Sequence, residues 1–192
     1  MNLFERLADV QRRWNVLEHP FYTRWERGEL TREELAFYAG EYRHAVVALA
    51  RQADAAGCAH ADEEAAHVDL WDDFAHALDA DLTRAPRPET HECAEAWAGG
   101  ADTLERLAVL YAIESAQPAI SKTKLAGLVA HYGFDAEGPG AAYFALHAER
   151  DLEHADESAK TLAAEATERD VERLVAAAEA ALRGNWRLLD AC

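Results

Sequence analysis

The sequence has few cysteines, few basic residues and no long apolar run. Its three cysteines, at positions 58, 93 and 192 of 192, are far apart and odd in number, which argues against a disulfide framework or a cysteine-based zinc site. Basic residues number 19 against 36 acidic ones, giving a net charge of −17. Such an acidic chain is unsuited to binding nucleic acid or an anionic membrane surface. No apolar segment reaches the roughly 18–20 residues of a membrane span.

Glycine and proline are also scarce, at 10 and 5 residues, so secondary-structure elements should be long. Half of the residues are hydrophobic, and the abundant Ala, Leu, Glu and Arg favour helix. No stretch alternates apolar and polar residues as a strand would. We therefore predict an all-α protein with a single helical domain over residues 1–192. Its charged, amphipathic first residues are unlike a signal peptide, so we expect a cytoplasmic protein with reduced thiols.

Capping signals place the helix boundaries. Thr31 and Glu34 form a capping-box pattern, and Gly57 can end the helix that follows. Pro118 should interrupt a later helix, because its ring conflicts with the carbonyl of Glu114. We expect helices over about residues 2–17, 20–28, 31–56, 60–78, 89–97, 102–132, 141–165 and 168–190, and a turn at residues 138–140.

His147, Asp151 and His154 form the first candidate metal site. Their spacing of i, i+4 and i+7 places two imidazoles and a carboxylate on one helix face. This donor set suits iron or another borderline metal. The alternative is a solvated face of a very acidic protein, although the neighbouring acids fall mostly on the other side of the helix.

A second candidate site lies around His67. Glu63, Glu64 and His60 precede His67 by four, three and seven residues, so each can share its helix face. The pattern carboxylate-x-x-His recurs in helical di-iron and di-manganese proteins. It occurs twice here, ending at His67 and at His154.

Glu114 is a third candidate contributor to a metal site. It follows the apolar run at residues 107–113, so its side chain should be buried. A buried charge must be paired or metal-bound; the alternatives are an arginine partner or protonation. Three histidines and three carboxylates suffice to hold two irons with positions open for dioxygen, which zinc would not activate. Hydrolysis at a two-metal centre is less natural with so many histidines.

These residues lie in longer segments that resemble the haem-oxygenase-like di-iron oxidases, a family within the group related to TenA and PqqC. The likeness is greatest to the CADD-like para-aminobenzoate synthases of folate biosynthesis. It is carried by residues 18–42, by HVDLWDDF at 67–74, and by two stretches that surround the candidate ligands at 113–134 and 141–157.

The resemblance implies a seven-helix bundle without haem. It implies a centre of two Fe(II)/Fe(III) ions, with manganese as an alternative at one position. Dioxygen and an external reductant would be its partners, together with a small-molecule substrate or the protein's own side chains; a homodimer is also consistent. The implied ligands are His67, Glu114, His147, Asp151, His154 and a sixth residue, for which we favour Glu63, then Glu64, with His60 as the ungapped match.

The resemblance also implies that Tyr22 is consumed to form the product and that Lys124 donates nitrogen. Lys124 is one of only three lysines in the chain. The plainer interpretations are a core tyrosine and a surface lysine. The chain departs from its relatives at Arg43, where they have a second tyrosine, and in a shorter segment between Tyr42 and His67. Other functions to weigh are oxygenation of an external amino acid or fatty acid, a metal-free TenA- or PqqC-like reaction, and a non-enzymatic interaction module.

Overall fold

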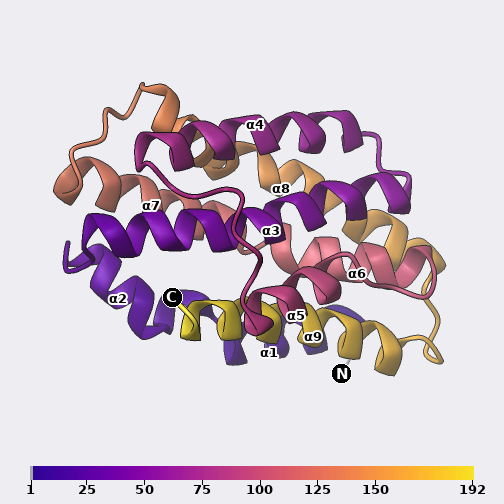
Figure 1. Cartoon of the computed structure of the whole chain (residues 1–192). Helices are drawn as coiled ribbons and strands as arrows, with labels where there is room; N and C mark the ends of the chain where they lie inside the picture. The colour runs from indigo at the N-terminus through magenta and orange to yellow at the C-terminus, as the bar shows by residue number, and fades with distance from the viewer. Residues whose placement is uncertain (1) are drawn as a thin grey trace.

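The computed structural model describes residues 2–192, which form helices joined by loops, with no strand among them (Figure 1). This confirms the all-α prediction. The elements are α1 (Leu3–Arg13), η1 (Val16–Glu18), α2 (Pro20–Glu26), α3 (Arg32–Ala56), α4 (Ala61–Ala77), α5 (Pro88–Trp97), α6 (Thr103–Glu114), α7 (Gln117–His131), α8 (Pro139–Glu165) and α9 (Val171–Asp190).

Local signals determine most boundaries as predicted. Thr31 and Glu34 form the expected capping box, and Gly57 ends α3 with a left-handed φ of 71°. The expected break near Pro118 divides one long helix into α6 and α7. Because of this break, and because α2 is a short separate helix, the chain has nine α-helices in residues 2–192 where the resemblance implied seven.

Two boundaries differ from the prediction. The first helix ends at Arg13 instead of continuing to residue 17, because the Asn15 side chain accepts a hydrogen bond from the amide of Leu17 and begins the short helix η1. The expected turn at residues 138–140 is instead the start of α8. Pro139 occupies its first position, where a helix needs no amide hydrogen.

The helices pack so that the candidate ligands lie close together. α8 contacts α4, α6 and α7, and α3 packs against α4 and α5. In Figure 1, α4 and α8 lie on one side, α1, α5 and α9 on the opposite side, and α3 runs between them. No helix in residues 2–192 is both long enough and apolar enough to span a membrane.

Buried tryptophans fix neighbouring helices to one another. The indole of Trp25 on α2 donates a hydrogen bond to the carbonyl of Lys124 on α7, at 3.1 Å. The indole of Trp71 on α4 donates to Ala39 on α3, at 2.8 Å. Trp97 makes the same kind of bond from α5 to α9. Each ring contributes a large apolar area to the core, and its N–H is satisfied.

Gly127 allows α2 to lie directly against α7. A Cβ atom at this position would lie 2.5 Å from Cδ1 of the Trp25 ring. Helix propensity alone would make Gly127→Ala stabilising by roughly 1 kcal/mol. We expect the opposite, a loss of about 1–3 kcal/mol in the free energy of unfolding, because the added methyl group overpacks the contact. Urea denaturation measures the change, and a more stable variant would contradict the close approach.

Candidate metal centre

Three helices bring seven ionisable side chains to one buried place. Helix α4 carries three of them, counting the residue at its N-cap; α6 contributes its last residue, and α8 contributes three. All are at most 6% exposed. The seven are His60, Glu64, His67, Glu114, His147, Asp151 and His154.

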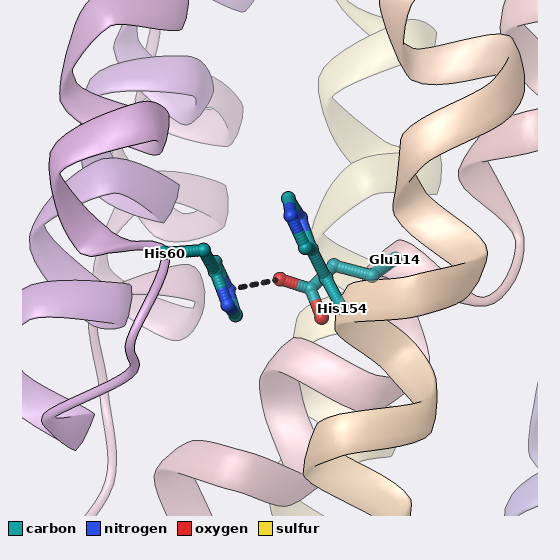
Figure 2. A group of neighbouring side chains, drawn as sticks. All are labelled: His60, Glu114 and His154. Carbon is teal, nitrogen blue, oxygen red and sulfur yellow. Dashed lines mark ion pairs between the residues drawn. The ribbon is translucent and has the colours of Figure 1, made fainter.

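The first group within this cluster is His60, Glu114 and His154 (Figure 2). Their ligand atoms lie within 4.8 Å of one another. The imidazoles of His60 and His154 stack almost in parallel, with ring centroids 3.9 Å apart. Nε2 of His60 lies 3.5 Å from Oε1 of Glu114. Two imidazoles and a carboxylate therefore converge from three different helices.

The second group is Glu64, Asp151 and His154, whose ligand atoms also lie within 4.8 Å of one another. Oε1 of Glu64 lies 3.4 Å from Nδ1 of His154 and 3.2 Å from Nδ1 of His67. Oδ1 of Asp151 lies 2.7 Å from Nδ1 of His147. His154 belongs to both groups, so the cluster is continuous.

Helical spacing explains the convergence. Residues 60, 64 and 67 and residues 147, 151 and 154 both follow the i, i+4, i+7 pattern, so each set lies on one face. Helices α4 and α8 pack with these faces toward each other. Glu114 completes the cluster from the last position of α6, and two residues separate it from the start of α7.

Several buried atoms of the cluster have no hydrogen-bond partner. They are both carboxylate oxygens of Glu114, Nε2 of His60, Nδ1 of His67, Nε2 of His147 and Nδ1 of His154. Unpaired buried polar atoms are costly. Burial raises the pKa of Glu114, and the nearby His60 offsets this only in part. Divalent cations would satisfy these oxygens and nitrogens, and a mixed imidazole and carboxylate set suits iron or manganese.

Residues 30–189 match a protein family described as iron-containing redox enzymes. The chain belongs to this family. Relatives named 4-aminobenzoate synthase are 32% identical in Chlamydia muridarum, over 82% of this chain and 76% of the relative, and 30% identical in Chlamydia trachomatis, over 99% and 91%. A third, from Nitrosomonas europaea, is 30% identical over 98% and 90%.

Solved structures bear out the fold of this chain. A domain from Shewanella denitrificans with a haem oxygenase-like fold superposes with a TM-score of 0.79 at 22% identity, covering 100% of this chain and 91% of that one. A TenA homologue from Pseudomonas syringae gives a TM-score of 0.80 at 17% identity, covering 98% and 89%. The predicted resemblance to the haem-oxygenase-like and TenA-related group is therefore confirmed.

The structure separates the three candidates upstream of His67. The sequence favoured Glu63, but the Glu63 side chain is 55% exposed and its carboxylate lies 3.9 Å from Nε2 of His154, at the outer edge of the cluster. Glu64 and His60 are the buried members. Although burial of Glu64 opposes ionisation, the neighbouring imidazoles of His154 and His67 lower its pKa overall. The placement favours Glu64 and His60 over Glu63 as inner ligands.

Lys124 is fully buried in the core, which rules out a surface lysine. Its Nζ has no hydrogen-bond partner and is surrounded by aromatic rings. The ring centroid of Tyr42 lies 4.3 Å away, that of Tyr38 5.5 Å and that of Tyr22 5.8 Å. Trp71 and Phe144 complete this aromatic cage. Burial lowers the pKa of Lys124 to about 7, so much of its amine is neutral near neutral pH.

Lys124→Met should make the protein more stable at pH 7, by about 1–3 kcal/mol, because it removes a buried polar group without a partner. The pKa of Lys124 falls from 10.5 in the unfolded chain to about 7 in the fold. The unfolded chain therefore binds more protons between these values, and this lysine makes stability rise with pH. Chemical denaturation from pH 7 to about pH 9 should show a steeper rise in the wild type than in the variant. If the free energy of unfolding rose equally with pH in the wild type and in Lys124→Met, the burial of a neutral amine at this position would be contradicted.

Three features around these sites were not predicted from the sequence. Tyr38 and Tyr42 lie one helical turn apart on α3, and that i, i+4 spacing was the available signal for the aromatic cage. Glu157 is one of the acids that neighbour His154 in the sequence, and its Oε2 lies 3.4 Å from Nδ1 of His60. Arg43 forms an ion pair with Asp72 across α3 and α4.

Proposed function

We propose that this chain is a dioxygen-dependent dimetal oxidase that forms 4-aminobenzoate from its own Tyr22, with Lys124 as the nitrogen source. The observation that carries the proposal is the buried cluster of four imidazoles and three carboxylates, several of whose atoms lack a partner. The names of the relatives, 4-aminobenzoate synthase, suggest the product.

Each group of ligands would hold one metal ion. His60, Glu114 and His154 would form the site of one ion and Glu64, Asp151 and His154 the site of the other, so that His154 lies between the two ions. His67 and His147 lie beside the second group, with ring centroids 4.5 Å apart. Iron would occupy both positions, or manganese one of them. Bound there, the pair would supply the redox chemistry that activates dioxygen.

Tyr22 has the carbon skeleton that the product requires. Its ring and Cβ match the ring and carboxyl carbon of 4-aminobenzoate, in which carboxyl and amino groups lie opposite each other. Forming the product breaks the Cα–Cβ bond of Tyr22 and oxidises Cβ to a carboxylate, with dioxygen as the oxidant and the external reductant supplying the remaining electrons. The phenol oxygen leaves as water. Nζ of Lys124 joins the ring in its place as the Cε–Nζ bond breaks, and Cε is left as an aldehyde. Tyr22 is 1% exposed, so bulk water is excluded from its ring.

The position of Lys124 supports its role as the source of that nitrogen. Its Nζ lies 5.8 Å from the centroid of the Tyr22 ring. Because its pKa is lowered to about 7, its amine carries a free electron pair near neutral pH, as a nucleophilic lysine requires. The hydrogen bond between the Trp25 indole and the Lys124 carbonyl holds α2, and therefore Tyr22, beside α7.

The amount of product formed per chain tests the proposal. Metal-loaded protein would be given dioxygen and a reductant but no organic substrate. We expect at most one molecule of 4-aminobenzoate per chain, with peptide mass spectrometry locating the lost side chain at residue 22. Continued turnover on an added amino acid or fatty acid, with Tyr22 intact, would instead support an oxygenase with an external substrate.

A further inference from the structure

A cavity of about 250 Å³ lies beside the metal cluster, at the turn between α3 and α4. The turn contributes Cys58 and His60, and the first residues of α6 contribute Thr103. Helix α8 contributes Glu157 and Ser158. No lysine or arginine lines this cavity, so its charge favours a cation.

His60 connects the cavity to the interior. Its Nδ1 lies 3.4 Å from Oε2 of Glu157, whose side chain is 56% exposed. Its Nε2 lies 3.5 Å from Oε1 of Glu114, whose side chain is 2% exposed. One imidazole therefore stands between a carboxylate in contact with solvent and a carboxylate of the buried cluster.

The inner wall of the cavity carries a donor atom that the fold leaves free. Ser158 is 1% exposed, and its hydroxyl has no hydrogen-bond partner. The thiol of Cys58 is free and half-buried at the same wall. The imidazole, carboxylate and hydroxyl groups together form a donor set that divalent transition metals accept.

A metal ion needs a route from solvent to the buried cluster. Each of its seven side chains is at most 6% exposed, so a hydrated ion cannot reach them directly from solvent. We propose that this cavity is where a divalent transition-metal ion is first captured. Glu157 holds the ion at the surface, and His60 passes it inward to Glu114 as water ligands are exchanged for protein ligands. No electron is transferred in this step. The inference rests on the dimetal centre proposed above.

The rate of metal uptake tests this route independently of activity. Apo-protein would be mixed with Co(II) chloride in a stopped-flow instrument, and the visible absorption of bound cobalt would be followed. We expect Glu157→Gln to slow uptake on the order of three- to tenfold, because one attracting charge at the mouth is lost. The final number of ions per chain should not change. Glu165→Gln is the matched control, since it removes the same charge from the exposed end of α8.

A second variant leaves every proposed donor in place. Thr161→Leu adds bulk at the cavity wall and should also slow uptake. Equal rates for Glu157→Gln, Thr161→Leu and Glu165→Gln, with normal loading of the wild type, would overturn the route while leaving the dimetal centre intact. A lower final stoichiometry in Glu157→Gln would also overturn it, because Glu157 would then be a permanent ligand. A wild type that binds no cobalt would overturn the dimetal centre itself.

Discussion

Tyr22→Phe is expected to reduce formation of 4-aminobenzoate to background while leaving the metal content unchanged. The substitution removes only the phenol oxygen, the atom that nitrogen must replace, and keeps the ring packed against Phe21 and Trp25. None of the seven cluster residues is altered. Product would be measured by liquid chromatography after exposure to dioxygen, and metal by elemental analysis of the same samples.

Tyr111→Phe is the matched control for this loss. Tyr111 lies on α6 and packs edge-on against Phe4, outside the aromatic cage of Lys124. It should form as much product as the wild type. If Tyr22→Phe kept full activity on an added substrate, the self-consuming reaction would be refuted. The assignment of the metal ligands would not be affected by that result.

His154→Ala is expected to remove most of the bound metal, because His154 is the one residue shared by both ligand groups. Its ring also stacks on His60, which would lose its position. We expect well under one ion per chain, against about two in the wild type. His76→Ala, at the exposed last turn of α4, should bind as much metal as the wild type.

Elemental analysis after gel filtration would measure this difference, and circular dichroism would verify that the variant remains helical. A folded His154→Ala protein that still bound two ions per chain would contradict the assignment of both groups. Loss of one ion alone would mean that His154 serves a single metal position, and the sharing inferred from the geometry would be wrong.

The sequence was most informative where the pattern is local. The spacing of His147, Asp151 and His154 predicted a shared face, and the structure has these three side chains together. It could not distinguish Glu63 from Glu64, because both lie within one turn of His67. The rotation of α4 against α8 decides which of them is buried, and that rotation depends on contacts between residues distant in the chain.

The surroundings of Lys124 also depend on contacts between distant residues, which local sequence patterns do not predict. Its rarity in an arginine-rich chain singled it out, but its burial depends on rings from α2, α3, α4 and α8 that surround it. Helix boundaries followed local capping signals at Thr31, Gly57 and Asp102. The sequence missed the early end of α1, where the Asn15 cap competed with a continuing apolar pattern.

Anaerobic loading with Fe(II), followed by metal analysis and exposure to dioxygen, tests the central claim most directly. The account predicts about two irons per chain, bound by imidazoles and carboxylates, and a transient visible absorption band when dioxygen is admitted. A protein that binds no iron above background, or whose spectrum does not change with dioxygen, would contradict it.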